Sequence, residues 1–291
     1  MTANPTTVAH STRPGIVWIS SYPKSGSTWL RLALASLRRG GAPVRINGFK
    51  EGQEIPGANR PLFDRLCDVD SSDLPADVVL AARPHMFRMV AAGLSHNVFC
   101  KVHDAFVRVG DGSFLFPPQV TVGAVHVCRD PRDVAVSLAH HMGITIDAAI
   151  GTMADPRYGR FETRPGLSRG LPQAILTWSA NIDSWCDAAA FPVTLLRYED
   201  MHADPVTTLA RAARAAAMPA EPDALLRACA ATRFDVLRDQ ERAEGFDETP
   251  PTARSFFRKG TAGGWRDVLS RAQQDRILRD HGATMARLGY V

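Results

Sequence analysis

Short apolar runs alternate with amphipathic segments along most of the chain. Four runs have the length and composition of buried strands, at residues 16–19, 97–103, 122–128 and 192–198. Apolar residues recur at helical spacing in six segments, at residues 27–39, 131–141, 171–190, 203–217, 222–231 and 270–288. Strands separated by helices predict an α/β fold with a doubly wound, mostly parallel sheet flanked by helices. Ligands of such sheets bind beyond the carboxyl ends of the strands.

The remaining segments have less regular patterns. Residues 74–94 are expected to be helical in part, with an interruption at Pro84. Two long stretches, 41–73 and 143–170, are rich in Gly, Pro and charged residues and are expected to be irregular excursions. No internal repeat or second hydrophobic block is evident. We therefore expect a flexible tail at residues 1–13 and a single domain at residues 14–291.

The first strand is followed by a loop suited to bind phosphate or sulfate. Turn-forming residues fill 22–27, and the helix expected from Ser27 or Thr28 would aim its backbone N–H groups and its dipole at one anion. Lys24 adds a positive charge, and the loop also offers hydroxyl donors, namely Ser25, Ser27 and Thr28. The loop departs from the Walker pattern because Lys24 precedes Gly26. An ordinary strand-to-helix turn is the alternative.

Two further cationic elements are candidates for the same ligand. Arg129 follows a strand and can form a forked contact with a phosphate, while Ser137 lies about two turns along the next helix. The alternative is an Arg–Asp pair beside a solvated serine. Arg258, Lys259 and Gly260 form a basic loop in which the glycine allows close approach to a ligand. A solvated basic loop is the alternative there.

His103 and Lys101 are candidates for proton transfer and charge stabilisation. They lie two residues apart at a strand end, so alternation places both side chains on the same side. A neutral His103 could remove a proton from an acceptor hydroxyl while Lys101 stabilises negative charge. A structural, hydrogen-bonded histidine is the alternative. His140 and His141 point in different directions on a helix and no acidic ligand is evident, so we predict no metal site.

Composition narrows the class of protein. Hydrophobic residues make up 45% of the chain and charged residues 22%, which is typical of a soluble globular protein. The net charge of +4 fits an anionic ligand and is too weak to indicate nucleic-acid binding. The five cysteines form no C-x-x-C pair and are expected to be reduced. The polar segment 1–13 does not resemble a signal peptide, and no window reaches the length of a membrane span, so a cytoplasmic protein is expected.

Four motifs in order along the chain resemble those of the cytosolic-type sulfotransferases, which transfer sulfuryl groups from 3′-phosphoadenosine 5′-phosphosulfate (PAPS). The resemblance covers residues 16 to about 290, and the Ala- and Arg-rich composition favours a bacterial member. The motifs are Tyr22-Pro-Lys-Ser-Gly-Ser-Thr-Trp29, Cys128-Arg-Asp-Pro-Arg-Asp-Val-Ala-Val-Ser137, Arg197-Tyr-Glu-Asp-Met201 and Arg258-Lys-Gly-Thr-Ala-Gly-Gly-Trp265.

The resemblance implies a role for each candidate residue. The 5′-phosphosulfate would be held by residues 24–29, with Lys24 at the bridging oxygen and Trp29 against the adenine. Lys101-Val-His103 matches the family's Lys-x-His, which makes His103 the expected base. The 3′-phosphate would be bound by Arg129, Ser137, Arg258, Lys259 and Gly260. The adenine side would be lined by Tyr198, Thr232, Arg233 and Phe234.

The chain also departs from the family pattern. Asp104-Ala105-Phe106 stands where many animal members have a Leu-Pro type segment, so acceptor recognition should differ. Gly264 replaces a frequent acidic or amide residue, which should leave phosphate binding intact. The dimerisation pattern of animal members is degenerate, so a homodimer is possible without following their mode. Its remnants are Arg266, Ser270, Arg271 and Asp275.

The sequence therefore predicts in-line sulfuryl transfer from PAPS to a hydroxyl acceptor, with Lys24, Lys101 and His103 as the catalytic residues, adenosine 3′,5′-bisphosphate (PAP) as product and no metal. The acceptor would be a small molecule, saccharide, lipid or natural product facing 41–73 and 143–170. Candidate acceptor contacts in the second stretch are Arg157, Tyr158, Arg160 and Arg164.

Two other functions stay open at this point. An ATP-dependent phosphotransferase is disfavoured by the displaced Lys24 and by the lack of an obvious Mg²⁺-binding aspartate after a strand. A nucleotide-binding regulator without catalysis is disfavoured because Lys101 and His103 are both present.

Overall fold

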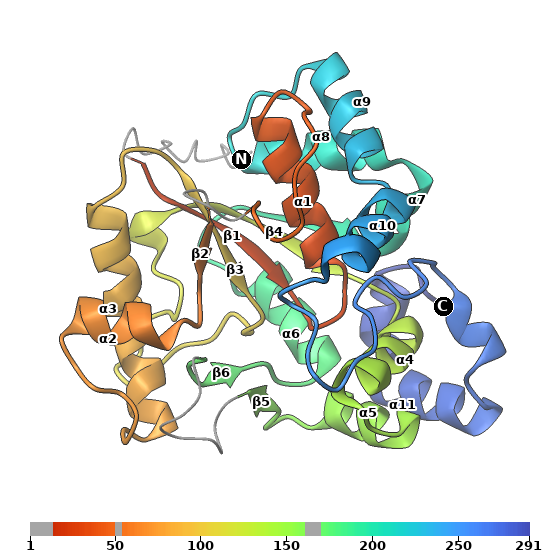
Figure 1. The fold of residues 1–291 in the computed structure, drawn as a ribbon. Helices are drawn as coiled ribbons and strands as arrows, with labels where there is room; N and C mark the ends of the chain where they lie inside the picture. The colour runs from red at the N-terminus through yellow and green to blue at the C-terminus, as the bar shows by residue number, and fades with distance from the viewer. Residues whose placement is uncertain (1–13, 50–53, 161–169) are drawn as a thin grey trace, which may run out of the picture.

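A five-stranded parallel sheet forms the centre of the molecule (Figure 1). The computed structural model describes residues 14–49, 54–160 and 170–291. The strands are ordered β2-β3-β1-β4-β7, and each neighbouring pair is parallel, which confirms the predicted sheet. Their bounds are Ile16–Ser21 for β1, Glu54–Pro56 for β2, Val98–Val102 for β3, Thr121–Cys128 for β4 and Val193–Arg197 for β7.

Helices cover both faces of this sheet (Figure 1). Val17 and Ile19 of β1 pack into an apolar cluster with α1, α8 and α9. Ile16 and Trp18 pack into the opposite cluster with α3 and α6, where the Trp18 and Phe87 rings meet edge to face at 4.8 Å. β1 is the middle strand of the order, and helices bury both of its faces. These helices are α1 (Ser27–Arg38), α3 (Ala76–Ala92), α6 (Trp178–Asp187), α8 (Pro205–Ala215) and α9 (Pro222–Ala231).

A further apolar cluster joins α4, α5, α6 and α11 beside the sheet. It includes Trp178, Ile182 and Ile277, all fully buried. The remaining helices are α2 (Arg60–Cys67), α4 (Pro131–Met142), α5 (Ile146–Ala154), α7 (Tyr198–Ala203), α10 (Phe234–Glu244) and α11 (Arg271–Arg287). Two short strands pair antiparallel, β5 (Gly159–Arg160) and β6 (Gln173–Ala174), and two 3₁₀ turns cover Pro118–Val120 and Gly264–Asp267.

The two stretches expected to be irregular contain regular elements. Within 41–73 lie β2, which extends the sheet beyond β3, and α2, whose first turn is capped by the Asn59 side chain at the Leu62 N–H. Within 143–170 lie α5, capped by Thr145, and β5. The expectation of irregular structure was wrong there. These elements are too short to give a clear periodic pattern in the sequence, and each helix is capped by one side chain. The tail expected at residues 1–13 lies outside the described residues.

Other helix boundaries also differ from the prediction. Pro84 lies inside a continuous α3, where burial of its neighbours Arg83, Met86 and Phe87 outweighs the missing hydrogen bond. The helix expected from residue 171 begins only at Trp178, because Leu176 has a φ of 65° and Thr177 caps the helix. α10 follows α9 after a short break and was not predicted.

Two features concern the expectations about membrane spans and cysteine oxidation. Among the described residues no single helix is long and apolar enough to cross a membrane, and α4 with α5 passes that test only as a pair bent by 113°. All five cysteines are free thiols, as expected. Burial raises the pKa of Cys128 to about 12, which makes this thiol unreactive.

Candidate functional site

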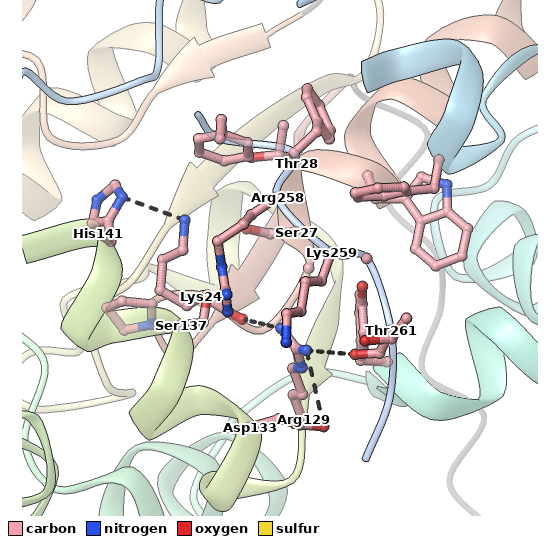
Figure 2. Close-up of a pocket in the computed structure, with 18 of the residues that line it drawn as sticks. Lys24, Ser27, Thr28, Arg129, Asp133, Ser137, His141, Arg258, Lys259 and Thr261 are labelled. Carbon is pink, nitrogen blue, oxygen red and sulfur yellow. Dashed lines mark hydrogen bonds and ion pairs between the residues drawn. The ribbon is translucent and has the colours of Figure 1, made fainter. Parts of the chain in front are cut away.

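A cavity of about 250 Å³ opens at the carboxyl ends of β1, β3 and β4, where the sheet topology places a ligand (Figure 2). Most of the predicted site residues line it, namely Lys24, Gly26, Ser27, Thr28, Trp29, Lys101, His103, Arg129, Ser137, Tyr198, Phe234, Arg258, Lys259 and Gly260. Ser25 and Thr232 do not line the cavity. Residues more than 200 positions apart in the sequence therefore meet at one site.

The loop between β1 and α1 has the geometry of an anion-binding turn. Gly26 immediately precedes α1 and has a φ of 104°, and a Cβ there would lie 2.5 Å from Cδ2 of Tyr198, so only glycine fits. Lys24 also has a positive φ, of 70°. No side chain caps α1 and its first turn holds no acidic residue. Its first N–H groups therefore suit a phosphate or sulfate group.

The Lys24 ammonium lies against the side chains of two other segments (Figure 2). Its Nζ is 3.3 Å from Nδ1 of His141 and 4.1 Å from the centre of the Phe256 ring. Because an ammonium only donates hydrogen bonds, Nδ1 of His141 is the acceptor. Sequence reasoning considered His141 only as a metal ligand. Its place one turn after Ser137, on the same face of α4, is the signal that could have brought it into the site.

Arg129 connects three parts of the site (Figure 2). Its guanidinium donates to the backbone oxygens of Lys24 at 3.4 Å and Thr261 at 2.9 Å, and it lies 4.2 Å from the centre of the Tyr198 ring. The Nε atom of Arg129 is buried and has no hydrogen-bond partner. A buried donor without a partner is costly, which favours a ligand that would satisfy it.

The segment that follows the basic loop is held in place by a carboxylate that sequence reasoning did not identify. Asp133 accepts from the backbone N–H groups of Gly263 at 2.6 Å and Trp265 at 2.9 Å, and its carboxylate lies 3.9 Å from Arg129. Burial raises the pKa of Asp133, and the charge of Arg129 opposes that rise. Asp133 belongs to the same motif as Arg129, and this membership could have identified it as a site residue.

Gly260 packs directly against the ring of Phe234. Its φ is 62°, and a Cβ on it would lie 2.1 Å from Cδ2 of that ring. Burial, followed by the charge of Arg129, lowers the pKa of the neighbouring Arg258. Burial and the charges of Arg258 and Lys259 lower the pKa of His140. More cations than carboxylates line the cavity, which favours a polyanionic ligand: Lys24, Lys101, Arg129, Arg258 and Lys259 against Asp133 and Glu248.

Aromatic side chains form the wall beside α1. Trp29 donates from Nε1 to the backbone oxygen of Thr232 at 2.8 Å, and its ring lies 5.8 Å from Tyr198 and 4.8 Å from His202. Thr232 thus fixes the Trp29 ring through its backbone oxygen, while its hydroxyl donates to the backbone oxygen of Ala228 in α9. Burial raises the pKa of Tyr198, which keeps its phenol protonated. Flat rings at this position suit a nucleobase.

His103 is held in a single orientation at the end of β3. Its Nδ1 lies 2.8 Å from the backbone oxygen of Ser21 and 3.3 Å from that residue's hydroxyl. A carbonyl oxygen only accepts, so Nδ1 carries the proton and Nε2 is the basic nitrogen of the neutral ring. Asn181 donates to the His103 carbonyl at 3.0 Å, which also fixes the backbone. In this tautomer Nε2 is the nitrogen that can accept a proton.

The residue after His103 is part of a buried ion pair. Asp104 receives two hydrogen bonds from Arg83, at 2.8 and 2.9 Å, and both side chains are fully buried. Asp104 also accepts from the backbone N–H of Ala174 in β6, and Arg83 donates to the backbone oxygens of Gly57 and Pro172. Asp104 therefore connects the end of β3 to β6 and does not line the cavity.

Several candidate residues lie elsewhere. Ser25 is fully buried beneath the loop, with a hydroxyl that has no partner. Arg157 is 90% exposed and Tyr158 packs against Tyr22, and neither lines the cavity. Arg164 and the side chain of Arg160 lie outside the described residues. In the part of the chain that is described, no three His, Cys, Asp or Glu side chains are grouped as metal ligands would be.

Sequence comparisons relate the chain to known enzymes. The family model for the sulfotransferase domain matches residues 115–289, which is more than half of the chain. Cytosolic sulfotransferase 13 of Arabidopsis thaliana is 22% identical over 275 residues, covering 89% of this chain and 73% of the plant protein. Sulfotransferase 1A1 of Canis lupus familiaris is 21% identical over 284 residues, covering 95% of this chain and 85% of the dog protein.

Solved structures share the fold. A retinol dehydratase in complex with androsterone and the inactive cofactor PAP superposes with a TM-score of 0.59 at 17% identity, covering 95% of this chain and 82% of that one. A mouse sulfotransferase complexed with PAP superposes with a TM-score of 0.57 at 16% identity, covering 94% of this chain and 85% of that one.

Proposed function

Because this chain belongs to the sulfotransferase domain family, we propose that it transfers the sulfuryl group of PAPS to a hydroxyl acceptor by in-line displacement. One observation carries the proposal. Three separate cationic elements, represented by Lys24, Arg129 and Arg258, line the same cavity as His103. A nucleotide with phosphate groups on both sides of its ribose would satisfy all three elements at once.

The residues present fit such a nucleotide. The N-terminal N–H groups of α1 would bind the 5′-phosphosulfate. Arg129, whose buried Nε has no hydrogen-bond partner, would contribute to the site of the 3′-phosphate. The 3′-phosphate would be bound by Arg129, Ser137, Arg258, Lys259 and Gly260. The adenine would lie between Trp29 and Phe234, on the aromatic side of the cavity. Bound PAPS supplies the sulfuryl group and leaves as PAP.

The chain's own side chains would carry the proton and the charge. His103 would take the acceptor proton on Nε2, since its Nδ1–H is directed to the Ser21 carbonyl. The ammonium groups of Lys24 and Lys101 would stabilise negative charge on the transferring and leaving groups. These roles require that His103, Lys24 and Lys101 be held in fixed positions around the reacting groups.

The acceptor would enter from the side of β2, α2 and the segment around β5, and would be a small-molecule, saccharide, lipid or natural-product hydroxyl. We also propose that residues 14–291 act as one domain, because the cavity takes residues from Pro23 through Gly264. Dimerisation of this chain stays a prediction.

The replacement His103→Ala tests the assignment of the base. With labelled PAPS and a panel of hydroxyl acceptors, we expect turnover to fall by about a hundred- to ten-thousand-fold. PAP affinity, measured by calorimetry, should change by less than about threefold, because His103 acts on the acceptor. His85→Ala, on the exposed surface of α3, is the matched control and should turn over normally. Full activity in His103→Ala would exclude His103 as the base.

A thermal-shift comparison tests the nucleotide. PAP should stabilise the protein, whereas ATP with Mg²⁺ should stabilise it less because ATP lacks the 3′-phosphate. Stronger stabilisation by ATP with Mg²⁺ would favour a phosphotransferase instead.

A further inference from the structure

A buried network of charges lies behind the reactive end of the cavity. Arg31, three residues after Thr28 on α1, has a side chain that is only 1% exposed. Its guanidinium donates to both oxygens of Glu54, at 2.8 and 2.6 Å, and to both oxygens of Glu248, at 3.2 and 2.9 Å. Burial works against the charge of Arg31, but the two carboxylates raise its pKa on balance. Arg31 therefore stays charged and holds both carboxylates in place.

Glu248 extends this network into the cavity. The residue lies in the segment between α10 and the basic loop, and it lines the cavity together with Lys101 and Thr28. Its Oε2 atom accepts from the Thr28 hydroxyl at 3.2 Å and lies 3.6 Å from the Lys101 ammonium. The carboxylate thus contacts one residue of the phosphosulfate loop and one residue of the Lys-x-His segment.

The donors around Glu248 indicate what it does. Arg31 donates to both of its oxygens, Thr28 donates to Oε2, and the Lys101 ammonium lies 3.6 Å from Oε2, so both oxygens of the carboxylate are already hydrogen-bonded. The charges of Arg31 and Lys101 balance those of Glu54 and Glu248. A carboxylate whose oxygens are hydrogen-bonded and whose charge is balanced in this way is suited to fix its neighbours rather than to bind a cationic acceptor.

We propose that Glu248 is a positioning residue that holds the Lys101 ammonium at the reactive end of the cavity, with Arg31 fixing the carboxylate. Lys101 has a flexible four-carbon stem, and an ion pair at 3.6 Å restricts where its ammonium lies. Glu248 also takes the single hydroxyl hydrogen of Thr28, so Thr28 would contact the 5′-phosphate through its backbone N–H. The inference rests on the proposed role of Lys101 in sulfuryl transfer.

The replacement Glu248→Gln tests the proposal kinetically. It keeps the shape of the side chain and removes its charge, and Arg31 keeps Glu54 as a partner. We expect kcat to fall by about 10- to 100-fold, because a misplaced catalytic group costs about that much, while KM for PAPS changes by less than about threefold. Glu244→Gln is the matched control, since Glu244 pairs with the exposed Arg45, and it should leave kcat unchanged.

A double-mutant cycle separates positioning from a general structural role. In a Lys101→Met background, Glu248→Gln should lower kcat by less than about twofold further, because its effect passes through Lys101. An unchanged kcat in the single variant, or the same fold loss in both backgrounds, would overturn the proposal. If Glu248→Gln does not fold, the same measurements are made on Glu248→Asp, which keeps the charge on a side chain one carbon shorter.

A measurement without turnover keeps this inference distinct from the proposed function. An ion-paired ammonium acylates slowly because losing its proton would break the pair. Peptide mass spectrometry should therefore show severalfold faster acetylation of Lys101 in Glu248→Gln than in the wild type or Glu244→Gln. Equal labelling would refute the positioning role. Absence of sulfuryl transfer by the wild type would refute the proposed function. The labelling result would still show whether Glu248 holds the Lys101 ammonium.

Discussion

The contact between Gly260 and Phe234 predicts that a single added methyl group weakens nucleotide binding. In Gly260→Ala, the new Cβ would lie 2.1, 2.3 and 2.4 Å from three atoms of the Phe234 ring, whereas an ordinary contact begins near 3.4 Å. The ring or the loop must therefore shift by more than about 1 Å. The φ of 62° adds a cost of about 1–2 kcal/mol for any residue with a side chain.

The size of the effect on binding follows from what the loop carries. Displacing Gly260 moves Arg258 and Lys259, and losing one charge-assisted hydrogen bond to a phosphate costs about 1.5–3 kcal/mol. The dissociation constant of PAP should therefore rise by about 10- to 100-fold. Isothermal titration calorimetry with PAP measures this change directly.

Gly40→Ala is the matched control for this prediction. Gly40 has a φ of 66°, but a Cβ there would meet nothing within 4 Å. Backbone strain should cost both variants a similar amount of stability, and the clash with Phe234 should add to the loss in Gly260→Ala, as thermal melts would show. Only Gly260→Ala should lose affinity for PAP. Unchanged PAP affinity in Gly260→Ala, or an equal loss in Gly40→Ala, would refute the reasoning.

Two further predictions concern stability. Asp104→Ala leaves the Arg83 guanidinium buried without its partner and should lower the free energy of unfolding, measured in urea, by about 3–5 kcal/mol. The control Asp239→Ala removes an exposed ion pair and should change this free energy by less than about 0.5 kcal/mol. Comparable small losses in both variants would contradict the prediction. Burial lowers the pKa of His126 to about 3, below the value of about 6.5 expected in the unfolded chain, so its contribution is present above pH 6.5 and is lost as the pH falls toward 3. The free energy of unfolding should drop by about 1.4 kcal/mol per pH unit within that window from this residue, and an identical acid slope in His126→Asn would rule the effect out.

The sequence predicted the parts of the fold that depend on local pattern. The runs at β1, β3, β4 and β7 are apolar enough to be recognised as buried strands, and α1, α4, α9 and α11 begin and end within about two residues of the predicted bounds. β2 and α2 escaped notice because a three-residue strand and an eight-residue helix give too little periodicity. α10 escaped because only Leu237 of its residues is buried, so it lacks an apolar stripe.

The candidate site shows the same division. Lys24, Arg129 and Arg258 could be identified because they belong to motifs and because strand ends meet at one edge of a parallel sheet. Glu248 could not, because its hydrogen bond to Thr28 joins residues 220 positions apart and no local pattern marks either partner for the other. The hydrogen bond between Lys24 and His141 also joins residues far apart in the sequence, at a separation of 117 positions, so the local pattern does not predict this contact.

The order of the cavity walls along the chain has a consequence for biosynthesis. The loop between β1 and α1 is made first, Arg129 follows near the middle, and Gly264 is the last of the described residues that line the cavity. A nascent polypeptide on the ribosome must therefore extend past Gly264 before its nucleotide site can close. Nucleotide in the cell can stabilise the finished enzyme by mass action, but the growing intermediates gain no such help and must rely on their apolar clusters alone.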